Sequence, residues 1–252
     1  MLENAPSKSH TARWITGIVL ALVSFVLCTG PMAFSSDKPE LDIAMLLRVP
    51  NLAPSLTVEE VAQALTPFQD HVRKVLEEQK DNKRQIEDLA VSFAAARKVL
   101  RPRVPKVTKI TFYSLLPVEA SNLGKPGYKD YNAARVAELK KLPRFHEYPV
   151  LGSITIADAD EANRWADFMR DQVWRGADLL CDFAPRHGFR FSTPKGDIDM
   201  LMCFTCDQLA IMGGDRLDNK NNPVFSRSVQ VLINQLLDKR KIERDDPDMK
   251  GK

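Results

Sequence analysis

The sequence predicts an α+β fold with a largely antiparallel sheet and packing helices, preceded by an N-terminal signal or anchor helix and a long helical segment. Three observations support this prediction. Short β-branched and aromatic runs follow one another on tight connections in the C-terminal half, amphipathic segments with helical periodicity lie between and after them, and an apolar run occupies residues 14–28.

The composition is that of an ordinary globular protein, and it excludes several classes. The chain has 252 residues, of which 44% are hydrophobic and 27% are charged. Because 36 Lys and Arg oppose 33 Asp and Glu, the net charge of +3 creates no basic field that would favour nucleic acid as a partner. With 11 Gly, 16 Pro and no repeat, collagen-like, solenoid and largely disordered chains are excluded as well.

Residues 1–35 have the layout of a signal peptide or a membrane anchor. Basic residues precede the apolar run, and Ala33-Phe34-Ser35 places small residues at the positions that a signal peptidase reads. If the segment is not cleaved, residues 14–34 are just long enough to span a bilayer, so the membrane becomes a partner; a buried core helix is the third interpretation. Under the first two, residues 36–252 are extracytoplasmic: periplasmic, secreted or anchored in the cytoplasmic membrane.

Two segments connect this region to the rest of the chain. Residues 36–56 contain three prolines among short apolar stretches and are expected to form a linker. Residues 57–101 are expected to form a helical arm. Thr57-Val58-Glu59-Glu60 has the pattern of a capping box, which predicts a helix start, and Thr66-Pro67 predicts a second start.

The arm carries a heptad pattern. From Phe68 to Leu100 the mostly apolar positions step by four and three residues, with polar interruptions at Gln79 and Asn82. The pattern predicts either a coiled coil that makes a homodimer through residues 67–100 or spaces the domain from the membrane, or two amphipathic helices. In the second case the helices are joined near residues 80–83 and pack on each other as a hairpin or on the body of the protein.

A domain boundary is expected at the Pro-containing residues 101–105, followed by an α+β domain at residues 106–242 and a disordered polar tail at residues 243–252. Strands are expected at residues 107–116, 150–156, 179–183, 189–193, 198–204 and 209–212, and helices at residues 132–142, 158–176 and 224–239.

Three cysteines remain after removal of residues 1–35, and they allow four interpretations. An oxidising compartment favours one disulfide plus a free thiol, and strand alternation favours Cys181 with Cys203 as the pair. Cys181, His187, Cys203 and Cys206 have the number and type of ligands of a tetrahedral zinc site. The thiols can instead be small core residues, or they can act chemically, through redox chemistry at Cys203 and Cys206 or through a Cys–His pair with His187.

The residues Arg186-His187-Gly188-Phe189-Arg190 match the RHGxR string of the histidine acid phosphatases. This resemblance implies that His187 accepts a phosphoryl group while Arg186 and Arg190 hold its oxygens. That family also needs a second catalytic histidine far downstream, and no histidine follows Arg190 in this chain. A polar turn that depends on Gly188 is the alternative.

A second resemblance covers about residues 106–240. Residues 110–114, 145–152, 181–188 and 203–206 resemble a group of signal-bearing bacterial proteins with a Cys…ProArgHisGly…CysPhexCys layout. The resemblance implies an extracytoplasmic bacterial domain and no mechanism. It groups His146, Arg186, His187 and the three cysteines as one constellation.

Two functions of different classes follow. The first is a non-catalytic binding or structural module, stabilised by a disulfide or by a Cys/His zinc site. The second is a hydrolase or phosphatase-like enzyme that uses His187 with Arg186 and Arg190 or with Cys181. Zinc is the one cofactor that the residues suggest, and no ligand is indicated. Convergence of the Cys and His residues in a closed core would favour the module, and convergence in a concave site would favour the enzyme.

Overall fold

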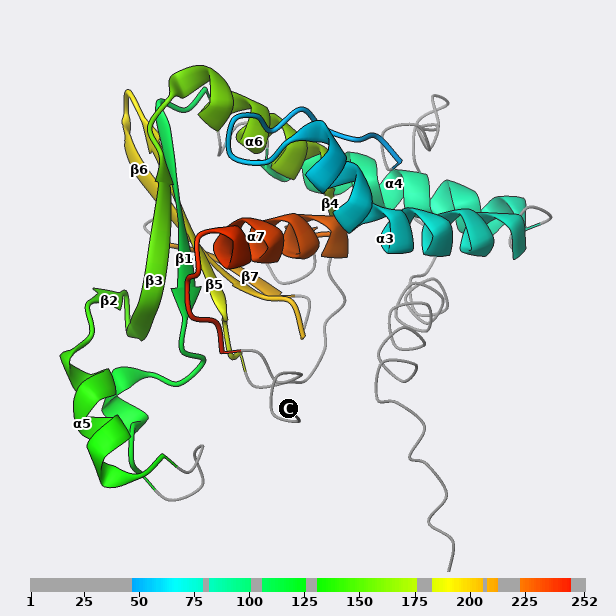
Figure 1. The fold of residues 1–252 in the computed structure, drawn as a ribbon. Helices are drawn as coiled ribbons and strands as arrows, with labels where there is room; N and C mark the ends of the chain where they lie inside the picture. Colours follow the sequence, from blue (N-terminus) through cyan, green and yellow to red (C-terminus); the bar gives the residue numbers. More distant parts are fainter. Residues whose placement is uncertain are drawn as a thin grey trace, which may run out of the picture.

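The computed structural model describes residues 47–78, 82–100, 106–125, 131–175, 183–205, 208–212 and 223–245, and in these residues it shows an α+β fold. A curled, antiparallel six-stranded sheet has the strand order β2-β3-β1-β5-β6-β7, and β4 pairs with β8 in a separate ribbon. In the described residues, five α-helices accompany the strands (Figure 1). The prediction of an α+β fold with a largely antiparallel sheet is therefore confirmed.

The bounds of the elements are as follows. The helices are α3 (Val58–Glu78), α4 (Lys83–Leu100), α5 (Ala133–Lys141), α6 (Ala159–Asp171) and α7 (Arg227–Lys239), with a 3-10 turn at Ala120–Asn122. The strands are β1 (Lys109–Leu115), β2 (Arg144–Phe145), β3 (Tyr148–Ile156), β4 (Val173–Arg175), β5 (His187–Thr193), β6 (Gly196–Cys203), β7 (Gln208–Met212) and β8 (Pro223–Phe225).

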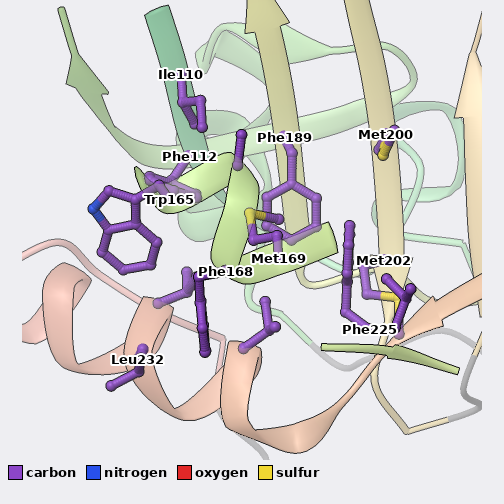
Figure 2. Close-up of a cluster of buried hydrophobic side chains, with 14 of the residues drawn as sticks. Ile110, Phe112, Trp165, Phe168, Met169, Phe189, Met200, Met202, Phe225 and Leu232 are labelled. Carbon is purple, nitrogen blue, oxygen red and sulfur yellow. The ribbon is translucent and has the colours of Figure 1, made fainter. Parts of the chain in front are cut away.

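One face of the sheet forms the wall of the main hydrophobic core. Phe112 of β1 packs edge-on against Trp165 of α6, with ring centroids 5.0 Å apart, and against Phe189 of β5 at 6.1 Å. Helix α7 supplies Leu232 to the same cluster, which Figure 2 shows between the strands and the helices. Because these side chains are almost fully removed from water, hydrophobic burial on this face is the main source of stability.

Helices α3 and α4 belong to the same core. They run out from the sheet and back beside each other (Figure 1). Leu65 of α3 and Phe93 and Ala96 of α4 lie in the main cluster, and so do Leu52 and Leu56, which fall in the segment expected to be a linker. The parts of α3 and α4 nearest the sheet are therefore packed into the body of the protein.

Helix α3 begins at the predicted capping box, but no second helix begins at Thr66-Pro67. Thr57 N–H donates to Glu60 Oε2 at 2.8 Å, and Glu60 N–H donates to Thr57 Oγ1 at 3.2 Å. Helix α3 continues through Pro67, so the prediction of a helix start at Thr66-Pro67 is wrong. Leu65 and Gln69 are buried on either side of the proline, and this tertiary packing outweighs the helix-breaking tendency of proline.

Two helix boundaries also differ from expectation. Helix α6 ends at Asp171 instead of residue 176, and α7 begins at Arg227 instead of residue 224. Val173 and Val224 lie in β4 and β8, which pair with each other. Both residues fit the apolar periodicity of the adjacent helix, and only the long-range pairing places them in strands.

The remaining expected strands correspond to β1, β3, β5, β6 and β7, and the helix expected at residues 132–142 corresponds to α5. Of the strand expected at residues 179–183, only residue 183 is described. The expected signal or anchor segment, residues 1–35, lies entirely outside the described residues. None of the described helices is long and apolar enough to cross a membrane.

Residues 243–245, the first of the expected disordered tail, lie across the sheet. Ser114 of β1 donates to the Glu243 carbonyl at 2.7 Å, and Arg186 donates to the Asp245 carbonyl at 2.9 Å. A Cβ on Gly152 of β3 would come within 2.6 Å of the Ile242 side chain, so the glycine lets Ile242 lie close against β3. Residues 242–245 are thus held against β3, β1 and the residue that precedes β5.

Candidate functional site

The other face of the sheet, termed the open face, carries a smaller apolar cluster that includes Leu115, Leu201 and Phe145, with polar side chains beside it. Strand alternation directs Ser153 and Thr155 of β3 to this face, where both are exposed. Tyr113 of β1 and Arg190 of β5 are half-buried on it. The open face therefore presents side chains with hydrogen-bonding groups to solvent.

The hairpin between β2 and β3 folds over the open face. Phe145 pairs with Tyr148, which leaves His146 and Glu147 as a two-residue loop. The Phe145 ring stacks on Tyr113 with centroids 4.2 Å apart. A Cβ on Gly188 of β5 would come within 2.7 Å of the Phe145 ring, so the absence of a side chain at this position lets the ring lie against the sheet.

Asp199 of β6 fastens this hairpin to the sheet. Arg190 donates from Nε to Asp199 Oδ1 and from Nη2 to Oδ2, both at 2.7 Å, in a bidentate pair. His146 Nε2 lies 3.0 Å from Asp199 Oδ2. One carboxylate thus connects the β2–β3 loop, β5 and β6. Tyr113, Phe145, His146, Arg190 and Asp199 are termed the open-face cluster.

The cluster is partly desolvated and carries opposite charges. The side chain of Asp199 is 11% exposed, that of His146 27% and that of Arg190 37%. The hydrogen bonds to Asp199 raise the pKa of the Arg190 guanidinium, which is therefore always charged. Burial raises the pKa of the Tyr113 hydroxyl above its usual value, so Tyr113 is neutral at physiological pH. Asp197 adds a second carboxylate 3.6 Å from Arg190 Nε.

The backbone of His146 adopts an unfavourable conformation. Its φ of 55° lies in the left-handed region, and among the described non-glycine residues only Lys241 shares this feature. Two-residue hairpin loops favour Gly, Asn or Asp where φ is positive. His146 is therefore held in place by its surroundings, chiefly by the contact with Asp199 and by the edge-on packing against Phe145 at 4.8 Å.

The chemistry available to the cluster is that of a fixed imidazole beside a fixed guanidinium. If His146 Nε2 carries the proton that Asp199 accepts, Nδ1 remains as a hydrogen-bond acceptor. The Arg190 guanidinium is pinned by Asp199 and lies 5.5 Å from the centre of the Phe145 ring, so its orientation is set before any ligand arrives. The cluster can thus offer both a donor and an acceptor in a defined geometry.

The residues of the phosphatase motif do not come together. His187 is 5% exposed and faces α7, where its Nε2 lies 2.9 Å from Asn234 Oδ1 and its ring packs edge-on against Phe204. Arg190 lies three residues further along β5 and therefore on the opposite face of the sheet. Arg186 is engaged by the carbonyl of Asp245. His146 and His187 are likewise on opposite faces.

Of the three cysteines, only Cys203 lies among the described residues. It is buried at the end of β6 and has no disulfide partner among the described residues. Cys181 and Cys206 fall outside the described residues, so both the disulfide and the zinc site stay predictions. Within the residues that the structure describes, no three His, Cys, Asp or Glu side chains are placed to hold a metal ion.

Sequence reasoning named His146 but missed Asp199, Tyr113 and Phe145, and it gave Arg190 a different role. A local signal for the main pair was present. The turn at residues 194–195 sets the register of β5 and β6, which places Arg190 directly opposite Asp199. Opposite charges in register across a predicted hairpin are a sign of a cross-strand ion pair. The contact to His146 has no such local signal.

The fold and the cluster together define a class: an α+β protein whose curled antiparallel sheet carries a hydrophobic core on one face and a charged, aromatic cluster on the other. Comparison with protein-family models, curated proteins and solved structures finds no match to this chain.

Proposed function

We propose that the protein is an extracytoplasmic binding module that recognises its ligand at the open-face cluster. The observation that carries the proposal is the left-handed backbone of His146, with a φ of 55°, at a loop position that favours glycine. Strained backbone persists where the surrounding structure determines it, and it concentrates at binding sites and active sites. A histidine at this position is best explained by a task of its side chain.

The cluster is organised as a rigid recognition surface. Asp199 fixes both His146 and Arg190, and the Phe145 ring contacts both Tyr113 and the guanidinium. Groups that are held in place before binding lose little conformational entropy when a ligand arrives. All five side chains lie on strands or on a two-residue loop, which favours precise positioning.

A substitution at His146 separates a binding role from a stabilising one. In His146→Gly the loop strain is relieved while the hydrogen bond to Asp199 is lost, so we expect a free energy of unfolding within about 1 kcal/mol of the wild type. Ligand-observed NMR with a library of small polar and aromatic fragments would report binding. We expect fragments that bind the wild type to lose affinity for His146→Gly and to bind Ser192→Ala, a control on the same face, without change.

Two results would contradict this proposal. In the first, His146→Gly is strongly destabilised and every fragment that binds the wild type also binds the variant, which would make His146 a structural residue. In the second, the fragments bind elsewhere on the molecule, which heteronuclear NMR shifts would reveal.

The pair of His146 and Asp199 also resembles the base and orienting acid of hydrolases. Chromogenic esters and phosphate esters test this second candidate. Turnover that is abolished by His146→Gly would assign an enzyme to the open-face cluster. Turnover that is abolished by His187→Ala would support the phosphatase-like alternative with Arg186, Arg190 or Cys181.

The extracytoplasmic location is part of the proposal. Its support is the basic, apolar and small-residue layout of residues 1–35 and the resemblance to signal-bearing bacterial proteins. Cell fractionation and N-terminal sequencing of the expressed full chain would distinguish a cleaved signal peptide from a membrane anchor. Recovery of the uncleaved chain in the cytosol would contradict the location.

Stabilisation by a disulfide or by zinc is a further part of the proposal. Its support is the set of Cys181, His187, Cys203 and Cys206 in the sequence. Protein made in an oxidising compartment would be assayed for free thiols and for zinc. One free thiol without zinc indicates a disulfide, bound zinc indicates the metal site, and three free thiols without zinc would contradict both.

A further inference from the structure

Strand β3 has one side without a partner. Its inner side pairs with β1 from Ile156 to Val150. Its outer side pairs with β2 only at Tyr148 and Pro149, and Val150 N–H donates to the Pro143 carbonyl. Beyond that point, residues 152–156 form an edge of the sheet to which no described backbone group is hydrogen-bonded on the outer side.

The register of the sheet shows which groups face outward. Leu115 N–H donates to the carbonyl of Arg186, the residue before β5, so the odd-numbered residues of β1 bond towards β5 and the even-numbered ones towards β3. Ile154 pairs with Phe112 and therefore bonds to β1. The backbone N–H and C=O groups of Ser153 and Thr155 consequently point away from the sheet.

This edge lacks the features that protect edge strands. Exposed edges in natural proteins are shortened, or carry lysine, proline or a bulge that prevents pairing with another chain. The stretch Gly152-Ser153-Ile154-Thr155-Ile156 contains no charge and no proline, and the irregularity in the pairing with β1 falls before it. Figure 1 shows β3 along the rim of the sheet, between α6 at one end and β2 and α5 at the other.

We propose that this edge pairs with the same edge of a second copy of the chain, giving a two-fold symmetric dimer with a continuous antiparallel sheet. With the axis beside Ile154, Ser153 of one copy lies opposite Thr155 of the other, and their outward backbone groups complete the ladder. Ile154 then meets Ile154 of the other copy on the helix-covered face, where β-branched cross-strand pairs are favourable.

The charges at the two ends of the edge favour a second copy as the occupant. Lys141 and Arg144 are exposed at the end near β2, and Asp158 and Asp160 are exposed at the end where α6 begins. Among the described residues, Lys141, Arg144 and Asp160 have no ion-pair partner. Antiparallel pairing brings the basic end of each copy to the acidic end of the other, twice by symmetry.

The test is the oligomeric state of the full chain, purified in mild detergent so that residues 1–35 stay in solution. Sedimentation velocity would measure the dimer dissociation constant. We expect Ser153→Pro, which removes an outward N–H, and Thr155→Lys, which adds a charge, each to raise it by at least about tenfold. Arg144→Glu should also raise the dissociation constant. Combining Arg144→Glu with Asp160→Lys should return the dissociation constant to the wild-type value, because the opposite charges are then exchanged.

Circular dichroism and the melting temperature at low protein concentration show whether each variant is folded. If Ser153→Pro does not fold, the double variant Arg144→Glu with Asp160→Lys still tests the proposal, because it should dimerise again. A wild-type chain that is monomeric at high concentration overturns the proposal. A dimer that persists in Thr155→Lys and Arg144→Glu but is lost in Val75→Glu overturns it in favour of pairing through residues 67–100.

Discussion

The two faces of the sheet are built by the same strands and differ in almost every physical property. Phe112 and Phe189 lie in the core on the helix-covered face, while Tyr113 and Arg190, their neighbours in sequence, lie on the open face. The first face buries large apolar side chains against α6 and α7. The second fixes charges and a strained loop at the surface. The comparison shows that the main hydrophobic core lies on one face, while the charged cluster that we propose as a binding site lies on the other.

The largest expected effect is on the helix-covered face. Phe112→Ala removes a fully buried ring that packs against Trp165 and Phe189, and we expect a loss of about 3–5 kcal/mol in the free energy of unfolding. Ser153 is exposed on the open face, and Ser153→Ala should change the free energy of unfolding by less than about 0.5 kcal/mol. Denaturant titration measures both. Equal losses would show that stability is not divided between the faces as described.

Gly188 and Gly152, which each lie in close contact with another side chain, test the difference between the two faces through smaller losses of stability. Gly188→Ala pushes a methyl group into the buried Phe145 ring, and we expect a loss of about 1–3 kcal/mol. Gly152→Ala meets Ile242, which is half-buried in the segment after α7 and can move, so its loss should be smaller. Thermal unfolding would rank the two variants. Adding Phe145→Ala should remove most of the steric cost at Gly188, and a strictly additive double variant would contradict the assigned contact.

The ion pair on the open face should contribute less than the core. Asp199→Asn weakens the contacts to both Arg190 and His146, and because the Arg190 side chain is 37% exposed, water screens part of the effect. We expect a loss of about 1–2 kcal/mol at neutral pH. A double-mutant cycle with Arg190→Met would isolate the coupling between Arg190 and Asp199. A coupling energy of zero would show that the pair does not organise the face.

The smallest expected effect concerns tyrosine ionisation. Burial raises the pKa of Tyr113 and of Tyr148 above their usual value, so the folded protein binds these protons more tightly than the unfolded chain. The corresponding stability is complete below the unfolded pKa of about 10 and is lost as the pH rises through the folded values. Ultraviolet absorbance of tyrosinate would follow the titration. Tyr113→Phe and Tyr148→Phe should each remove a late-titrating tyrosine, whereas unchanged late titration would contradict the assigned burial.

Several features of the fold were predictable because their signals are local. The capping box at Thr57 and Glu60 formed as expected, since all of its atoms lie within one helical turn. Strands β1, β5 and β6 were predicted from short runs of β-branched and aromatic residues on tight connections, which are visible over a few positions. The start at Thr66-Pro67 failed because burial of Leu65 and Gln69, which depends on distant elements, decided the outcome.

The open-face cluster shows the same limit for the site. Arg190 and Asp199 were within reach of prediction, because a short turn fixes their register. His146 lies 53 residues before Asp199, and its contact depends on the curl of the sheet and on the space above Gly188. The motif around His187 was visible in the sequence, yet alternation along β5 turned His187 and Arg190 to opposite faces.

The sequence by itself determined most of the helices and the strands β1, β3, β5, β6 and β7, because propensity and capping act between residues that are close along the chain. The tertiary structure alone decided that β4 pairs with β8, that Pro67 stays inside a helix, and that the hairpin carrying His146 folds over the sheet. These outcomes depend on contacts between distant segments, whose free energies outweigh local preferences of about 1 kcal/mol once a common core is formed.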